Sequence, residues 1–144
     1  MKSRKQSEAN IQQRPEGITY FVDASLGPSV AQGLRNANRD VIYHHELFPE
    51  ATDDDIWLAR AGSDGWVVLT KDSRLRYEPN VREAFMRAGA RVFCLVAGNM
   101  TASEMTFAFR AGLPEIEDLL ARRRGPFIAN LGKSGSLTGT IFPH

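Results

Sequence analysis

Aspartates at three points of the sequence have the residue type and the setting that metal-assisted hydrolysis of phosphate esters requires. Asp23 ends the apolar stretch 18–23, and Asp72 follows the apolar stretch 66–70 by two residues. Three further aspartates, at 53–55, open a segment with helical spacing. Carboxylates gathered at one site raise one another's pKa values unless a cation such as Mg²⁺ or Mn²⁺ neutralises them. If the fold brings these acids together, the expected chemistry is hydrolysis of a phosphodiester bond.

Each of these acids also has a purely structural explanation. Asp23 precedes Ser25 and Gly27, a setting in which aspartate commonly caps a turn, and Asp72 is followed by Ser73 in the same way. The acids at 53–55 complement the positive end of a helix macrodipole. A shared site is favoured because Asp23 and Asp72 both follow strands, and because one helix cap does not need three adjacent carboxylates.

Apolar stretches alternate with helical segments along the chain. The expected strands cover residues 18–23, 41–44, 66–70 and 91–96. The expected helices cover residues 28–37, 52–61, 81–88, 101–111 and 114–123, with loops at 45–51 and 76–79. This alternation predicts an α/β fold, a three-layer sandwich with a central, mostly parallel sheet. Neighbouring strands would then place Asp23 and Asp72 at one carboxyl-terminal edge, where open α/β sheets bind ligands.

The length of 144 residues fits one domain with a substantial core. We expect a disordered polar tail over 1–16, a domain over 17–131 and a C-terminal extension over 132–144 that forms a strand pair or stays mobile. The net charge of +1 excludes the overall electrostatic footprint of a nucleic-acid-binding protein and allows a local basic patch. With no secretory signal, no membrane span and a single cysteine, Cys94, in an apolar run, a cytoplasmic protein is expected.

Four short motifs, in this order, give the chain a family resemblance over about residues 18 to 130. They are Phe-Val-Asp-Ala-Ser-Leu at 21–26, Thr-Asp-Asp-Asp-Ile-Trp-Leu at 52–58, Val-Leu-Thr-Lys-Asp at 68–72 and Arg-Arg-Arg-Gly-Pro-Phe-Ile at 122–128. In these motifs the sequence resembles the PIN-like domains, metal-dependent ribonucleases that include the toxins of bacterial VapBC-type toxin–antitoxin pairs. The resemblance implies an endoribonuclease toxin that binds RNA, a DNA-binding antitoxin and a second copy of itself.

The resemblance also implies roles for individual residues. Asp23, an acid at the start of the second helix and Asp72 would bind Mg²⁺ or Mn²⁺; for the middle acid Asp54 is favoured over Asp53. The hydroxyl of Thr70 would orient the last acid, and Ser25 would bind a water of the metal.

The sequence departs from the family pattern in two places. Many relatives carry another acid shortly after the Thr-x-Asp motif, where this chain has Ser73, Arg74 and Leu75. The helix-borne glutamate has no clear counterpart, and Glu46 is the weak candidate. A catalytically degenerate interaction module therefore stays open as an alternative. An aspartate-based phosphohydrolase is ranked lower, because Ser25 stands where such an enzyme carries a second aspartate.

Several cations flank the last acid. Lys71, Arg74 and Arg76 would contact substrate phosphates, and an ordinary solvated loop explains them equally well. Trp57 and Trp66 sit in apolar patterns and are expected in the core.

Overall fold

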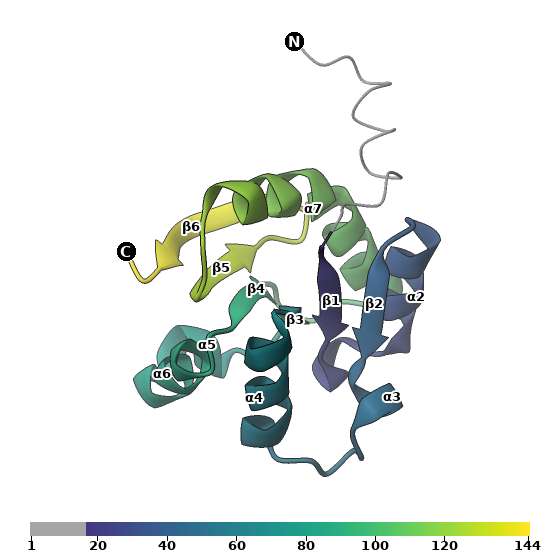
Figure 1. Cartoon of the computed structure of the whole chain (residues 1–144). Helices are drawn as coiled ribbons and strands as arrows, with labels where there is room; N and C mark the ends of the chain where they lie inside the picture. The colour runs from purple at the N-terminus through teal and green to yellow at the C-terminus, as the bar shows by residue number, and fades with distance from the viewer. Residues whose placement is uncertain (1–16) are drawn as a thin grey trace.

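Six strands form one sheet at the centre of the computed structural model, which describes residues 17–144 (Figure 1). The tail predicted over residues 1–16 lies outside the described residues. The strands are β1 (Thr19–Val22), β2 (Asp40–Tyr43), β3 (Val67–Thr70), β4 (Arg91–Leu95), β5 (Phe127–Leu131) and β6 (Leu137–Phe142). The helices are the 3-10 helix η1 (Ala24–Leu26), α2 (Pro28–Asn36), α3 (His44–Leu47), α4 (Asp54–Asp64), α5 (Arg74–Tyr77), α6 (Pro79–Arg87) and α7 (Ala102–Arg122).

The strands lie in the order β2-β1-β3-β4-β5-β6. β1 runs parallel to both of its neighbours, with Val22 opposite Tyr43 of β2 and Leu69 of β3. β4 and β5 continue the parallel sheet, and β6 pairs antiparallel with β5. The predicted α/β sandwich with a mostly parallel sheet is therefore confirmed. The segment 132–144 carries one strand, β6, whose partner β5 lies in the preceding segment.

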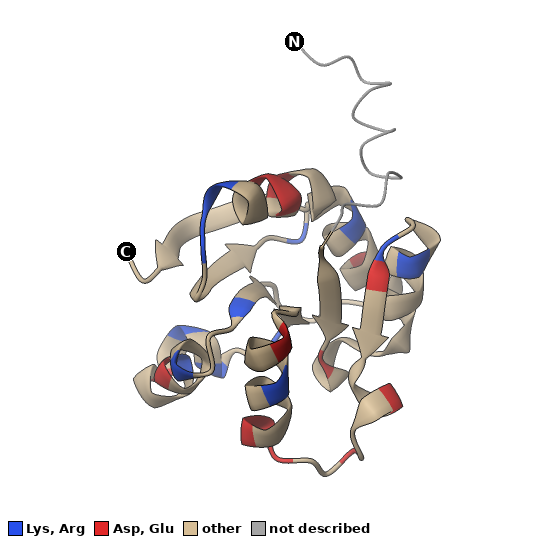
Figure 2. Cartoon of the chain, in the orientation of Figure 1, with Lys and Arg blue, Asp and Glu red and all other residues tan. Residues whose placement is uncertain are grey.

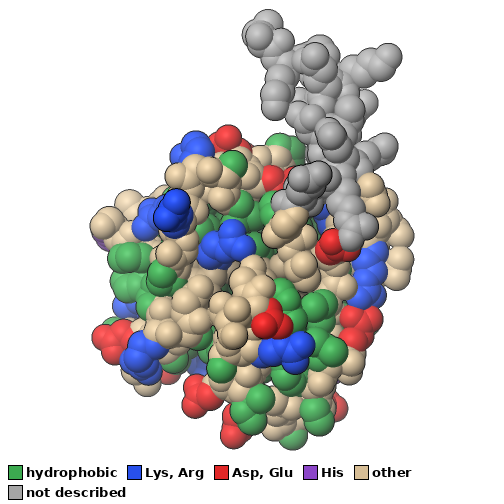
Figure 3. Space-filling view, viewed as in Figure 1, with side chains coloured by type: hydrophobic (Ala, Val, Ile, Leu, Met, Phe, Trp, Pro, Cys, Tyr) green, Lys and Arg blue, Asp and Glu red, His purple; other side chains and the backbone are tan. Residues whose placement is uncertain are grey.

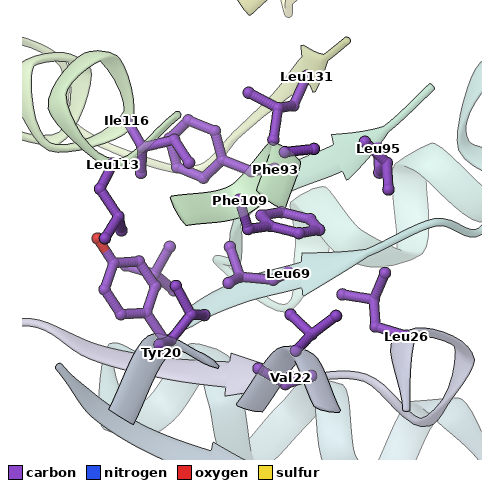
Figure 4. Close-up of a cluster of buried hydrophobic side chains, with 14 of the residues drawn as sticks. Tyr20, Val22, Leu26, Leu69, Phe93, Leu95, Phe109, Leu113, Ile116 and Leu131 are labelled. Carbon is purple, nitrogen blue, oxygen red and sulfur yellow. The ribbon is translucent and has the colours of Figure 1, made fainter. Parts of the chain in front are cut away.

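Successive strand residues point to opposite faces of the sheet, and each face has its own hydrophobic core. Figure 4 shows the first core, in which side chains of the sheet meet α7 and η1. Its labelled members include Tyr20, Val22, Leu69, Phe93, Phe109, Leu113 and Ile116. Helix α2 contributes to the same core with Val30 and Leu34. This face holds the sheet against its longest helix.

The second core lies on the opposite face, beneath α4, α5 and α6. Phe21 of β1 stacks on both tryptophans, with ring centroids 5.2 Å from Trp57 and 5.5 Å from Trp66. The two indoles are 2% and 7% exposed, which confirms their predicted place in the core. This stack fixes α4 over β1 and so fixes where its acidic first turn lies.

Helix α7 runs unbroken through Pro114, and the predicted division into two helices over 101–111 and 114–123 is wrong. Its buried residues keep helical spacing on both sides of the proline: Met105, Ala108, Phe109, Gly112, Leu113, Ile116 and Leu119. Burying this stripe outweighs the roughly 3 kcal/mol that a proline costs a helix interior. Gly112 serves close packing, because a Cβ there would lie 2.9 Å from Leu131 Cδ1.

The single-turn helices α3 and α5 overlap the two segments predicted as loops, 45–51 and 76–79. One turn is too short to produce a helical pattern, so periodicity could not detect it. The helix expected from residue 52 begins later, because Asp53 is the N-cap residue of α4 and Asp54 is its first residue. The Thr52 hydroxyl instead donates to the carbonyl oxygen of Pro49 at 2.7 Å.

A buried ion pair ties α7 to the sheet. The Arg39 guanidinium, whose side chain is 1% exposed, donates from Nε and Nη2 to the two carboxylate oxygens of Glu117, both at 2.8 Å. The hydroxyl of Tyr20 donates to the same carboxylate at 2.7 Å. Burial, followed by the charge of Glu117, raises the pKa of the Tyr20 phenol well above its usual value.

The surface shows no single-sign region on the face seen in Figure 3, where positive and negative side chains are interspersed. Among residues 17–144, no helix is both long and apolar enough to cross a membrane.

Candidate active site

Asp23 directly follows the last residue of β1 and lies at the carboxyl edge of the sheet. Its N–H donates to the carbonyl oxygen of Leu69 at 3.0 Å, which continues the pairing of β1 with β3. Its Oδ2 accepts two hydroxyl hydrogen bonds, from Ser25 Oγ at 2.7 Å and from Thr70 Oγ1 at 2.8 Å. Within residues 17–144, Oδ1 has no hydrogen-bond partner. Two hydroxyls therefore orient one oxygen of this carboxylate and leave the other available.

Thr70, the last residue of β3, connects two of the acids. Its side chain is fully buried, and its Oγ1 accepts the N–H of Asp72 at 3.1 Å while it donates to Asp23. A single hydroxyl thus fixes the carboxylate that follows β1 and the backbone that carries Asp72.

The carboxylate of Asp72 is held by Arg74. The backbone N–H and Nε of Arg74 donate to Oδ1 at 3.0 and 2.9 Å, and Nη2 donates to Oδ2 at 2.6 Å. Burial of Asp72 favours its protonated form, but the hydrogen bonds and charge of Arg74 outweigh burial. The pKa of the Asp72 carboxyl consequently lies below its usual value.

Asp54, the first residue of α4, is the third aspartate of the site. Its Oδ1 accepts the indole N–H of Trp57 at 3.0 Å, one helical turn further on. Its Oδ2 accepts Nη2 of Arg74 at 2.9 Å, so that one guanidinium bridges Asp54 and Asp72. The hydrogen bonds to Asp72, followed by those to Asp54, raise the pKa of Arg74 further above its already high value.

A cleft of about 410 Å³ opens where these elements meet. It is lined by Asp23, Ser25, Asp54, Trp57, Lys71, Asp72, Ser73 and Arg74. Figure 2 shows the setting, with acidic residues at the start of α4 and basic residues over α5 and α6. Strand order brings Asp23 and Asp72 to this edge, and the direction of α4 brings Asp54.

Three of the predicted site residues lie elsewhere. Asp53 is the N-cap of α4 and does not line the cleft. Glu46 pairs with Arg35 at 2.6 Å and also accepts the N–H of Tyr43, which lowers the pKa of its carboxyl. Arg76 lies over the ring of Tyr77, 5.0 Å from its centroid, and lines a neighbouring hollow.

Two residues beside the site, Trp57 and His44, have contacts that the sequence did not predict. Trp57 was expected only in the core, and His44 only at the end of a strand. The sequence interpretation gave Trp57 a packing role, whereas its indole N–H also holds Asp54. The spacing of an aspartate and a tryptophan three residues apart on a helix could have indicated this contact. His44 is 3% exposed and packs against Trp57, and burial lowers the pKa of its imidazole.

Carboxylate oxygens are the ligands that Mg²⁺ and Mn²⁺ prefer, so the acids suit such an ion chemically. Within residues 17–144, however, no three acidic, histidine or cysteine side chains are grouped closely enough to hold a metal. Arg74 occupies both oxygens of Asp72 and one of Asp54. Carboxylate oxygens that could bind a hard divalent cation are therefore taken by a cation of the protein itself.

Comparison with known proteins agrees with this architecture. No solved structure matches the chain. A protein of Mycobacterium tuberculosis (strain ATCC 25618 / H37Rv) named "Putative ribonuclease VapC45" is 33% identical over 113 residues, which cover 75% of this chain and 81% of that protein. The family described as "PIN like domain" matches residues 18–97, a stretch that includes Asp23, Asp54 and Asp72. The chain therefore belongs to the PIN-like domain family.

Proposed function

We propose that this protein is a metal-dependent endoribonuclease, the toxin of a type II toxin–antitoxin pair. The observation that carries the proposal is the meeting of Asp23, Asp54 and Asp72 in one cleft, from three elements far apart in sequence. Similarity to a protein named as a VapC ribonuclease supports RNA as the substrate. The partners that we propose with this function are an antitoxin that binds DNA and a second copy of the chain, and the proposed location is the cytoplasm.

Asp23, Asp54 and Asp72 would hold Mg²⁺ or Mn²⁺. When bound, such an ion stabilises charge on the phosphate and lowers the pKa of an attacking water. Thr70 and Ser25 would keep the Asp23 carboxylate in the orientation that the hydrogen bonds at 2.8 and 2.7 Å give it. Because Thr70 is buried, this orientation is set by the sheet and does not depend on solvent.

Lys71 is an exposed cation that lines the cleft, and it would contact a phosphate of the RNA backbone. Arg76 and Arg82 line the neighbouring hollow and would extend this contact along the strand. Phosphate contacts position a nucleic acid without selecting its sequence. These residues therefore predict binding that weakens as the salt concentration rises.

The substitution Asp72→Asn tests the site. We expect RNA cleavage in Mn²⁺ to fall on the order of 100-fold or more, because the metal loses a charged ligand. Growth inhibition on expression should disappear in parallel. The matched control is Asp55→Asn, an identical charge change at an exposed acid in the first turn of α4. Undiminished cleavage by folded Asp72→Asn protein, as judged by circular dichroism, would refute the site.

A catalytically inactive interaction module is the second candidate. The observation that favours it is the pairing of Arg74 with two of the three acids. Calorimetric titration with Mn²⁺ separates the two functions. A nuclease should take up the ion, whereas an inactive module should neither bind Mn²⁺ nor cleave RNA.

A further inference from the structure

Arg74 stands at the centre of the acidic cleft, with one guanidinium on two carboxylates. We propose that Arg74 is a resident counter-ion that a divalent cation must displace, and that its release supplies a guanidinium for the substrate phosphate. The inference rests on the proposed function in one respect, namely that the cleft takes a divalent cation. It adds a residue that couples binding of the metal to binding of RNA.

The hydrogen bonds of Arg74 occupy the oxygens that a metal would need. Both oxygens of Asp72 and Oδ2 of Asp54 accept from the guanidinium at 2.6 to 3.1 Å. Since a guanidinium stays protonated in proteins, its charge cannot be titrated away, and the only way to vacate these oxygens is movement of the side chain. Arg74 and a divalent cation therefore compete for the same ligands.

Asp23 lies outside this pairing. Its Oδ2 is held by the hydroxyls of Ser25 and Thr70, and among residues 17–144 its Oδ1 accepts no hydrogen bond. An incoming cation can thus reach Asp23 while Arg74 still holds the other two acids. This order of contact gives the exchange a starting point on the β1 side of the cleft.

The ion pair of Arg74 with Asp54 lies at the surface of the protein. The side chains of Arg74 and Asp54 are 47% and 45% exposed, so water screens this ion pair and it contributes little to stability. The side chain of Asp72 is 18% exposed, so its pair with Arg74 is the stronger of the two. Arg74 also begins the single-turn helix α5 at the surface, so its side chain can turn outward without moving the sheet.

A released Arg74 would remain in the cleft beside Lys71. Arginine binds phosphate with two parallel hydrogen bonds, the same geometry with which it now binds Asp72. With a cation on the carboxylates, the Arg74 guanidinium would bind the RNA phosphate, and the bound phosphate would keep the guanidinium away from these carboxylates. Each ligand must then strengthen the binding of the other by the same factor.

Calorimetric titration of Mn²⁺ into the full-length protein tests the competition. For Arg74→Gln we expect Mn²⁺ to bind at least about fivefold more tightly than to the wild type, within the usual range of coupling between sites. Arg74→Lys, which keeps the charge but loses the bidentate contact, should lie between the two. The matched control is Arg87→Gln, the same change at an exposed arginine of α6 whose ion pair is with Glu83. Its affinity for Mn²⁺ should stay within about twofold of the wild type.

A second titration tests the release of Arg74 for phosphate. The probe is a hydrolysis-resistant 2′-O-methyl RNA oligonucleotide, present at saturation while Mn²⁺ is added. RNA should tighten Mn²⁺ binding to the wild type by a larger factor than it tightens binding to Arg74→Gln. An equal factor in both proteins would overturn the coupling.

The outcomes separate this inference from the proposed function. Equal Mn²⁺ affinity in the wild type and in Arg74→Gln, with RNA cleavage intact, overturns the role of Arg74 alone. Tighter binding by Arg74→Gln without cleavage by either protein supports the role of Arg74 and contradicts the nuclease. If Arg74→Gln does not fold, the intermediate affinity expected of Arg74→Lys decides the question, and wild-type affinity in that variant overturns the inference. Absence of Mn²⁺ binding in every variant contradicts both.

Discussion

Replacing Thr70 by valine removes one buried hydroxyl and keeps the shape of the side chain. In the wild type this hydroxyl donates to the Asp23 carboxylate at 2.8 Å and accepts the N–H of Asp72 at 3.1 Å. A hydrogen bond to a charged group contributes about 1.5–3 kcal/mol, and an unpaired buried N–H costs about 1–3 kcal/mol. Since Ser25 still binds Asp23, we expect Thr70→Val to lower the free energy of unfolding by about 2–3 kcal/mol.

The assay is urea unfolding of metal-free protein, followed by the fluorescence of the two buried tryptophans, Trp57 and Trp66. For a chain of this length the expected loss corresponds to a fall in Tm of about 5–10 °C. The same protein should bind Mn²⁺ about 10- to 100-fold more weakly, the usual effect of removing a group that orients a metal ligand.

Two variants serve as controls. Thr70→Ser keeps the hydroxyl and loses the methyl group, so Mn²⁺ affinity should stay close to that of the wild type. Thr106→Val removes an exposed hydroxyl that donates only to the carbonyl oxygen of Ala102, and its effect should stay within about 0.5 kcal/mol. The reasoning is refuted if Thr70→Val is as stable as the wild type, or if Thr70→Ser loses as much Mn²⁺ affinity as Thr70→Val.

Two further changes test the fold. Burial and the charge of Glu117 hold the pKa of Tyr20 above its usual value, so the unfolded chain loses the phenol proton at a lower pH than the folded protein does. The free energy of unfolding should therefore fall above about pH 10, by up to 1.4 kcal/mol per pH unit. Tyr20→Phe should make that slope shallower in urea unfolding at pH 9, 10 and 11; an unchanged slope contradicts the assignment. A Cβ at Gly62 would lie 1.6 Å from the carbonyl oxygen of Ala88, so Gly62→Ala should destabilise by about 3 kcal/mol in thermal unfolding. Gly98→Ala, which adds a Cβ with no atom within 4 Å, should be neutral, and equal stability of both variants would contradict the packing argument.

The sheet and the place of the acids on it could be predicted because both follow from local pattern. Val67–Thr70 is a short buried run bounded by glycine and acid, which indicates a central strand. Once β1 and β3 are parallel neighbours, Asp23 and Asp72 must lie at the same edge. The common position of these two acids follows from the strand order alone and does not depend on side-chain contacts.

Helix α7 shows where local pattern fails. Pro114 disfavours a helix when the chain is considered residue by residue, whereas Leu113 and Ile116 beside it are fully buried on the sheet. Tertiary packing decided the outcome, and its strength depends on strands that lie far away in the sequence.

Arg74 could not be predicted for a different reason. A cation next to an acid can face substrate or face the acid, and the two arrangements differ only in the rotation of one long side chain. Its contact with Asp54 joins residues 20 positions apart, and only the folded chain brings them within reach. Sequence therefore predicted the charge of this residue and left its partners undetermined.

The ion pair of Arg39 and Glu117 has a consequence for how the molecule opens. It lies toward the amino-terminal end of the parallel strands. Detaching α7 there would leave the buried charge of Arg39 without its partner, which costs about 3–5 kcal/mol of stability. Helix α7 and the centre of the sheet should thus unfold as one cooperative unit, whereas at the opposite edge the ion pair of Arg74 and Asp54 is exposed. The amino-terminal edge of the sheet is thus the more stable one. Side chains of the cleft at the carboxyl edge can exchange partners while the sheet and α7 stay folded.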